Sequence, residues 1–429
     1  MQQQFWNKAK RWFAWIGGCA IVLILAAGGF WYWINIPPQV DIPTPVMPNP
    51  NGYDYFVRAA ATYVLDKKGV DEITDTELVK GKKYPLAAKE AWLNKNAKAF
   101  QLLREGLKYP ALQPPVRSYD DKHYINYAQF RNMTRGWVVE SHARAERGDW
   151  NGAVQSLLDD YHFGNQIGRG GSLIGVLVSV ATQSISLKSL GKIVERTDTT
   201  TAKMAATNIE TIYEQREPLT EYLQEYKWKT LSQMLELMKS PSQQLNSSSW
   251  RIGMIRSFRI PIVDYPKIFT MSKRKFIFDL TKAMDELIEN AQRPYVKQLP
   301  DPASGNLLVQ EFLPSSKSTR WNWARGATAS VAVMTMYALH AYKLDNGHYP
   351  KNLKKLVPTY LHKVPIDPFN GIAPIRYRLQ GNKYLLWSIG PDGVDDHGVP
   401  ITNKNKKRAP YINWSDDSQG DVVAGKNTP

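Results

Sequence analysis

The sequence predicts a chain of three parts: one apolar helix near the N-terminus, a mostly α-helical middle region, and a C-terminal α+β region. The first part follows from an uncharged run at Trp12–Ile34. The second follows from apolar residues at helical spacing between Tyr53 and Glu289. The third follows from a helix at about 335–346 and two strands at 375–379 and 384–388, which a glycine turn joins.

The apolar run Trp12–Ile34 is long enough to cross a membrane. As a helix it spans about 35 Å, against a hydrocarbon core of about 30 Å. Aromatic residues lie at both ends, and its flanking charges are one-sided, because no Lys or Arg follows it until Arg58 and three precede it: Lys8, Lys10 and Arg11. We expect a single-pass protein of the inner (cytoplasmic) membrane, with the N-terminus in the cytoplasm and the bulk periplasmic; a cleaved signal peptide is the alternative.

Composition and local patterns divide the chain into six expected segments. They are a basic cytoplasmic N-terminus (1–11), a transmembrane helix (12–34), a proline-rich linker (35–52), a helical domain (53–295), a second linker (296–320) and the α+β domain (321–429). The only cysteine is Cys19, so no intrachain disulfide is possible. The net charge of +16 favours anionic partners without choosing among them.

Within the helical domain, the periodicity predicts seven helices. They are expected at 53–66, 85–107, 124–147, 150–167, 172–194, 201–213 and 218–238. Gly148 and Asp149 predict the end of one helix and the cap of the next, as in a helical hairpin. The glycine-rich segment 164–175 lacks the Gly-Lys-Ser/Thr of a phosphate loop, so we interpret it as a turn between helices. The uncharged stretch 171–187 carries enough Ser, Thr and Gln to favour a buried core helix over a second membrane span.

The C-terminal motifs resemble the globular half of the major pseudopilins of type II secretion. The similar stretches are Tyr342-Lys-Leu-Asp-Asn-Gly-His-Tyr-Pro350, Val364-Pro-Ile-Asp-Pro-Phe369 and Trp387-Ser-Ile-Gly-Pro-Asp-Gly393. They cover roughly 100 residues. The resemblance implies a long helix packed on a small antiparallel sheet, a calcium ion held by the loop after the sheet, and a structural role. The processing site that leads into the family's N-terminal helix is absent from this chain.

The loop after the second strand is the candidate calcium site. Asp392, Asp395 and Asp396 place three carboxylates close together, and calcium prefers six to eight oxygen ligands. Ser388, at the end of the strand, is the fourth candidate ligand. The alternative is an acidic turn in which solvated carboxylates bind no ion.

A second candidate surface lies between residues 251 and 275, where basic residues alternate with aromatic and aliphatic ones. Such a mixture can lie on anionic lipid, although a solvated basic face of the helical domain is the alternative. The candidate residues are Arg251, Arg256, Arg259, Lys267, Lys273, Arg274 and Lys275. With the bulk of the chain outside the cytoplasm, no nucleic acid is expected as a partner.

These observations together predict a membrane-anchored, extracytoplasmic protein with a structural or interaction role in the cell envelope. Its partners would be membrane lipid, and envelope proteins or secretion-type assemblies. Two alternatives are an envelope hydrolase with its site in the helical domain and a peripheral binder of anionic lipid through 251–275. No nucleophile, base and oxyanion site can be assembled from the sequence, so no catalytic residue is named. The oligomeric state and the specific partner are not predicted.

Overall fold

The computed structural model describes residues 2–64, 84–118, 121, 127–239, 271–302, 306–314, 316–402 and 414–428. Its first helix is α1 (Gln2–Asn35). The helices of the body are α2 (Gly52–Thr62), α4 (Leu86–Lys95), α5 (Ala97–Gly106), α6 (Tyr127–Glu146), α7 (Trp150–Gln166), α8 (Leu173–Ile193), α9 (Thr199–Glu214), α10 (Leu219–Lys239), α14 (Lys273–Ala291), α15 (Leu307–Phe312) and α16 (Ser316–Asn346). The strands are β1 (Arg376–Gln380), β2 (Lys383–Ser388) and β3 (Val422–Val423). The predicted combination of an apolar N-terminal helix, a mostly helical chain and a small C-terminal sheet is therefore confirmed.

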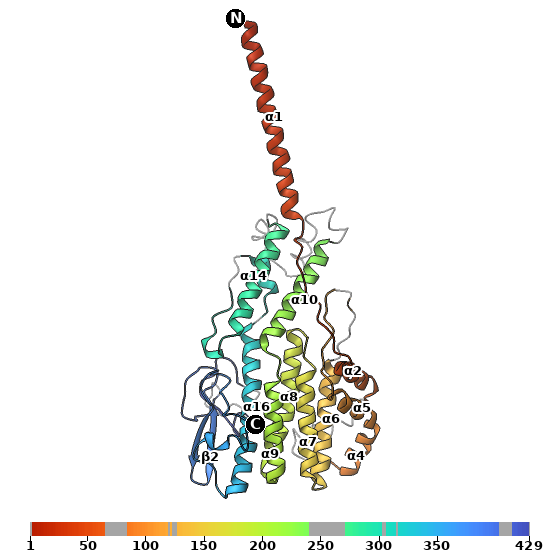
Figure 1. The fold of residues 1–429 in the computed structure, drawn as a ribbon, viewed down its shortest axis with the longest axis vertical. Coiled ribbons are helices and arrows are strands. Elements are labelled where there is room, and N and C mark those ends of the chain that lie inside the picture. The colour runs from red at the N-terminus through yellow and green to blue at the C-terminus, as the bar shows by residue number, and fades with distance from the viewer. Residues whose placement is uncertain are drawn as a thin grey trace.

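Helix α1 projects away from the body as a separate rod (Figure 1). Its described side chains from Trp12 to Trp33 are exposed. The segment Trp15–Asn35 is long and apolar enough to cross a membrane. An exposed apolar helix of this length is unstable in water, because its surface offers no polar face, and its length and composition are those of a membrane anchor or a signal sequence.

A second helix that meets the same length and composition criteria is α8, and it lies inside the body. Most of it is buried, including Val176, Leu187 and Leu190. It packs against α7 and α16. The prediction of a core helix in this stretch is confirmed.

The hairpin predicted at Gly148-Asp149 is also present. Gly148 has φ of 81°, which ends α6 in the left-handed conformation that glycine adopts most readily. Asp149 then caps α7, since its Oδ1 accepts a hydrogen bond from the backbone N–H of Gly152 at 2.8 Å.

One predicted helix, 85–107, is wrong, because the structure divides it into α4 and α5 at Asn96. The buried Asn96 side chain accepts a hydrogen bond from the backbone N–H of Val64 at 2.8 Å. Its amide also donates to the carbonyl of Trp92 at 3.3 Å. The side chain of Asn96 therefore ties the break between the helices to the chain after α2, a contact that periodicity does not reveal.

The C-terminal sheet is antiparallel, with strand order β1-β2-β3. Strands β1 and β2 form the predicted hairpin, with Arg376 opposite Trp387 and with Gly381 in the turn at φ of 58°. Strand β3 pairs with the end of β2, Val422 lying opposite Ser388.

The long helix α16 joins this sheet to the helical body. One apolar cluster extends from Val138 of α6 through Tyr337 of α16 to Leu386 of β2. The Tyr337 hydroxyl donates a hydrogen bond to the carbonyl of Leu190 in α8 at 3.0 Å. Because α16 is buried on opposite sides, the helical and α+β regions share a core.

The two segments expected to be linkers are folded onto the body where they are described. Val40 and Ile42 of the proline-rich segment are partly buried against the apolar cluster of α10 and α14. The segment 296–320 includes α15 and the first turn of α16. These contacts restrict how far either segment can separate the regions that it connects.

Candidate functional site

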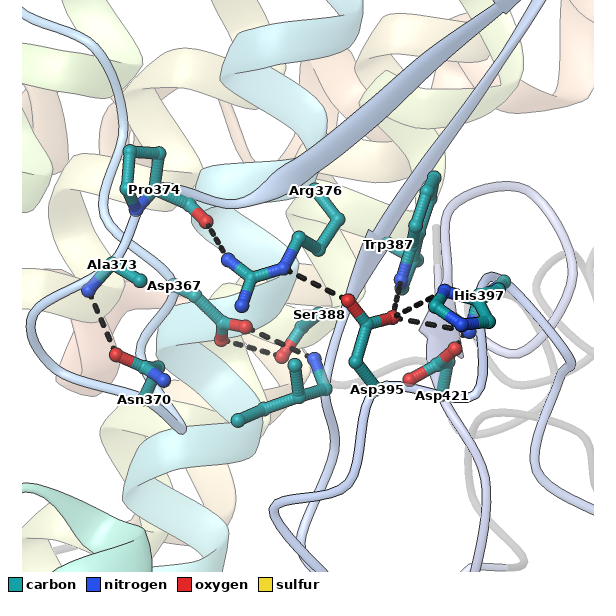
Figure 2. A network of polar contacts seen from close by, with 12 residues as sticks. Asp367, Asn370, Ala373, Pro374, Arg376, Trp387, Ser388, Asp395, His397 and Asp421 are labelled. Atoms are coloured by element: carbon teal, nitrogen blue, oxygen red, sulfur yellow. Dashed lines mark hydrogen bonds and ion pairs between the residues drawn. The ribbon is translucent and has the colours of Figure 1, made fainter.

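In the loop after β2, Asp395 is fixed by the neighbouring strands (Figure 2). Its Oδ2 accepts a hydrogen bond from Nε of Arg376 at 3.1 Å, and its Oδ1 accepts from Nε1 of Trp387 at 2.9 Å and from the backbone N–H of His397 at 3.0 Å. Burial opposes ionisation, but these hydrogen bonds and the Arg376 charge lower the pKa of Asp395. The carboxylate is therefore ionised at neutral pH.

Asp392 and Asp396 occupy different environments in the same loop. Asp392 accepts hydrogen bonds from the backbone N–H groups of Val394 at 3.1 Å and Gly420 at 3.0 Å, so it fastens the loop to the residue before Asp421. The Asp396 carboxylate is half-buried and makes no hydrogen bond or ion pair to another described residue. Asp396 thus keeps carboxylate oxygens available for a ligand.

Ser388 is directed away from the three aspartates of the loop. Its hydroxyl donates a hydrogen bond to Oδ1 of Asp367 at 2.6 Å, and both residues are fully buried (Figure 2). Asp367 also accepts from the backbone N–H of Ile389 at 3.0 Å. Ser388 therefore connects β2 to the turn at 365–371, and the structure does not bring it together with Asp392, Asp395 and Asp396.

The structure adds a carboxylate that sequence reasoning missed, Asp421. Its Oδ2 accepts a hydrogen bond from the backbone N–H of Gly398 at 2.6 Å, whereas Oδ1 is buried and has no hydrogen-bond partner among the described residues. The pKa of Asp421 is raised to about 6, mainly by burial and in part by the charges of Asp395 and Asp396, while backbone N–H groups of Gly398 and Asp396 oppose the shift. The pairing of β3 with β2 places Asp421 beside the loop, and the only local signal for that strand is the pair of β-branched residues Val422 and Val423 after it.

The oxygen atoms of this loop are of the type that calcium prefers, but the described side chains are not arranged as a complete set of ligands. Asp396 and the free oxygen of Asp421 are hard oxygen donors. Within the part of the chain that the structure describes, however, no three His, Cys, Asp or Glu side chains are grouped so that they could hold a metal ion. A calcium ion here would therefore require backbone carbonyls or water in addition to the carboxylates.

The basic surface is only partly described. Arg251, Arg256, Arg259 and Lys267 lie outside the described residues. Lys273 is buried and donates a hydrogen bond to the carbonyl of Met238 at 2.9 Å, so it adds no exposed charge.

Arg274 and Lys275 remain as surface cations at the start of α14. Lys275 is exposed and pairs with Asp279 at 3.0 Å. Arg274 donates from Nε to the carbonyl of Trp33 at 2.9 Å, and its guanidinium lies 4.3 Å from the centre of the Trp33 ring. Helices α14 and α10 are the part of the body nearest to α1 (Figure 1), so the two cations lie at the base of the apolar helix.

The glycine-rich segment 164–175 forms the turn between α7 and α8, as predicted. The backbone N–H of Gly170 donates a hydrogen bond to Oε2 of Glu217 at 3.2 Å. Burial raises the pKa of Glu217 to about 6, although the hydrogen bond from Gly170 opposes that shift. The segment is a structural contact between α8 and the start of α10.

The raised pKa of the buried Glu217 carboxyl predicts a pH dependence of stability. Between about pH 4.5, the ordinary value, and about pH 6 the unfolded chain has released the Glu217 proton while the folded chain retains it. Stability therefore falls as the pH rises through this window and is constant above it, with a loss of up to about 2 kcal/mol. Glu217→Gln should remove this slope in denaturant unfolding, while Glu286→Gln, at an exposed position of α14, should keep it. An unchanged slope in Glu217→Gln would contradict the assignment.

One cavity of about 610 Å³ lies between the end of α8 and the α+β region. A hydrolase would need a cavity of this kind to hold its substrate. His340 lines the cavity, with Nε2 at 3.0 Å from the carbonyl of Thr197, together with Glu195, Tyr349 and Tyr384. The described part of its lining includes no serine, threonine or cysteine. The described lining thus offers titratable groups, including two tyrosine hydroxyls, without a serine, threonine or cysteine nucleophile.

Comparison of the chain with protein-family models, with curated protein sequences and with solved structures found no match.

Proposed function

We propose that this protein is held in the cytoplasmic membrane by α1 and presents its folded body outside the cytoplasm. The observation that carries the proposal is the exposure of the whole described apolar surface of α1 beside a body with its own cores. In water this surface would cost on the order of 20 kcal/mol of unfavourable hydration, and a lipid bilayer removes that cost. A reporter enzyme fused after Pro429 tests the placement, because its activity depends on the side of the membrane that it reaches.

The proposed orientation rests on charge. Three basic residues precede the apolar run and none follows before Arg58. Positive charge next to a membrane span is retained on the cytoplasmic side. The short stretch before Trp12 is therefore cytoplasmic, and the body at the other end of α1 faces the periplasm.

We further propose a structural or interaction role in the cell envelope, with a C-terminal region arranged as in the major pseudopilins. The resemblance of the motifs at 342–393 supports this role, as does the packing of the last turns of α16 against β2 beside a β1–β2 hairpin. The fold alone does not specify a function, so the partner is identified only as an envelope protein or a secretion-type assembly.

Calcium binding at the loop after β2 is part of this proposal. The residues that would hold the ion are Asp396 and Asp421, together with backbone carbonyls and water. The unpartnered Oδ1 of Asp421 supports the site, because a buried carboxylate oxygen without a hydrogen bond is costly unless a cation neutralises it. When bound, the ion would relieve the repulsion among these carboxylates.

Calcium should therefore raise the melting temperature of the full-length protein in detergent. At 100-fold excess over Kd, binding stabilises the folded state by about 2.7 kcal/mol, which corresponds to a shift of several degrees. Magnesium should substitute poorly, because it requires a tighter octahedral shell. Asp396→Asn should abolish the calcium effect and leave the melting temperature in chelator unchanged or higher, whereas Asp54→Asn on exposed α2 should retain it. Identical melting of the wild type in calcium and in chelator would refute the site.

A second candidate function is contact with anionic lipid by the end of the body next to α1. It is favoured by the position of Arg274 and Lys275 and by Phe278, which is 68% exposed on the same helix. Cations beside an exposed aromatic residue are typical of surfaces that lie at a lipid headgroup layer. In this arrangement the body rests on the membrane instead of standing away from it.

A further inference from the structure

A cavity of about 320 Å³ lies where the helical body meets the α+β region. It is bounded by the junction of α9 and α10, the C-terminal end of α14, the first half of α16, and the turn at 366–371. Three arginines line it: Arg216, Arg293 and Arg320. Aromatic side chains form much of the remaining wall, among them Trp323, Tyr213 and Tyr295.

Arg216 is stacked on aromatic rings and has no charged partner. Its guanidinium carbon lies 3.6 Å from the centre of the Trp323 ring and 5.0 Å from that of Tyr213. The guanidinium makes no hydrogen bond or ion pair with the residues that the structure describes, and burial lowers the pKa of Arg216. The aromatic rings contact the flat face of the guanidinium. Its N–H donors point outward in the plane of the group and have no acceptors among the described residues.

Arg320 is the second donor in this cavity. Its side chain is 6% exposed. Nη1 lies 3.1 Å from Oδ1 of Asp301, yet Nε has no hydrogen-bond partner among the described residues. The N–H groups of an arginine buried this deeply normally all have hydrogen-bond acceptors. The unpaired Nε of Arg320 therefore indicates an acceptor that the described residues do not supply.

Arg293, the third arginine of the lining, lies at the mouth of the cavity. It is half-exposed, and its ion pair with Glu289 is long, at 3.9 Å. Of the three guanidinium groups, then, only Arg320 has a close carboxylate among the described residues. The cavity consequently carries excess positive charge in a wall that is partly aromatic, where an anion is attracted more strongly than in bulk solvent.

We infer that this cavity binds an oxyanion, the carboxylate or phosphate group of a small molecule, with Arg216 and Arg320 as the principal donors and Arg293 at the entrance. Planar guanidinium groups match both kinds of oxyanion, because two parallel N–H donors can meet two oxygens. The volume lies at the lower end of the range for small-molecule sites, which favours a compact acid or phosphate ester over an extended chain. This binding site is independent of the calcium loop and of the membrane anchor.

The test is isothermal titration calorimetry of the full-length protein in detergent, with inorganic phosphate and citrate as separate probes at constant ionic strength. We expect saturable binding of at least one probe, and sodium chloride should give no saturable heat. Arg216→Gln should weaken that binding at least tenfold, because it removes a charge-assisted donor pair. Arg216→Lys should give an intermediate loss, since the charge remains while the fork of donors is lost.

The matched control is Arg58→Gln. Arg58 is an exposed arginine of α2 that lies 5.0 Å from the centre of the Tyr55 ring, so its replacement removes the same charge and a similar stacking contact. It should leave binding unchanged. Arg293→Gln is the second test variant, because a half-exposed side chain can be replaced without disturbing the core even if Arg216→Gln fails to fold.

The two probes separate the sources of the anion: tighter binding of phosphate identifies a phosphate ligand, and tighter binding of citrate identifies a carboxylate. Three outcomes would overturn the inference. They are no saturable binding of either probe to the wild type, equal binding to the wild type and Arg293→Gln, and equal loss in Arg58→Gln, which would show screening of general surface charge.

Discussion

Replacing Glu210 with alanine is expected to lower the free energy of unfolding by about 3 kcal/mol. Glu210 lies on α9, and its carboxylate is 2% exposed. Its two oxygens accept hydrogen bonds from the backbone N–H of His362, at 3.0 and 2.8 Å, and one of them accepts from that of Lys363 at 3.3 Å. Alanine would leave these donors without acceptors at the junction of the helical body and the α+β region.

The control for this variant is Glu214→Ala, one turn along the same helix. Glu214 pairs with the side chain of Lys363 at 2.8 Å, but both are on the surface. Exposed pairs of this kind contribute about 0–1 kcal/mol, so this variant should be close to the wild type. Urea unfolding of both variants measures the difference.

The shape of the urea unfolding curve shows whether the helical and α+β regions unfold together. Because the helical and α+β regions share a core through α16, we expect Glu210→Ala to shift one cooperative transition to lower urea. A separate early transition confined to the α+β region would instead show that this region folds independently of the helices. Equal stability of Glu210→Ala and Glu214→Ala would show that the buried carboxylate does not hold the two regions together.

The second large effect is expected at a membrane surface. Protein that lacks residues 1–36 should bind vesicles of anionic lipid at low salt, and Arg274→Glu combined with Lys275→Glu should weaken this binding at least about 30-fold. Each cation near an anionic surface contributes about 1 kcal/mol, and charge reversal adds repulsion. The described contacts of α1 with the body are with α14, at the end of α1 that includes Trp33, and no residue of α1 belongs to the described cores, so the truncated chain retains them. Sedimentation with vesicles measures the bound fraction.

A matched control reverses two lysines elsewhere. Helix α16 runs away from α1 (Figure 1), and Lys354 and Lys355 are exposed in the short helix Leu353–Leu356 that follows its C-terminal end. Lys354→Glu combined with Lys355→Glu makes the same change in net charge at the opposite end of the body. This double variant should affect vesicle binding only slightly. If both double variants lose binding equally, or if neutral vesicles bind the wild type as well as anionic ones, α14 does not direct the body onto lipid.

Local signals in the sequence were sufficient for several elements. The Gly148-Asp149 pair marked a helix end and a helix cap through backbone chemistry that acts within a few residues. The β1–β2 hairpin was marked by a glycine turn between alternating residues. These features depend on neighbours along the chain, so a single sequence contains the information.

The features that were missed depend on contacts between distant segments. Asn96 interrupts a helix because it binds Val64. The Ser388 hydroxyl binds Asp367, and the pairing of β3 with β2 brings Asp421, not Ser388, beside the loop that follows β2. Lys273, placed on the basic surface because of its charge, is buried at the end of α10. No periodicity in the chain records such pairings.

The oxyanion cavity illustrates the same limit. Arg216, Arg293 and Arg320 are far apart in sequence and carry no shared motif. They meet because α16 passes between the α9–α10 junction and the end of α14. Only the tertiary arrangement shows that two of these guanidinium groups have donors without acceptors among the described residues.

A pair of reporter fusions after Pro429 tests most directly whether α1 crosses the cytoplasmic membrane and holds the body outside the cytoplasm. One fusion carries alkaline phosphatase, which is active only outside the cytoplasm, and the other carries a fluorescent protein that folds only inside it. We expect no fluorescence, and high phosphatase activity that stays in the membrane fraction after alkaline extraction. A fluorescent, phosphatase-negative pair would contradict the proposed orientation, and phosphatase activity in the soluble fraction would show that α1 is a cleaved signal sequence.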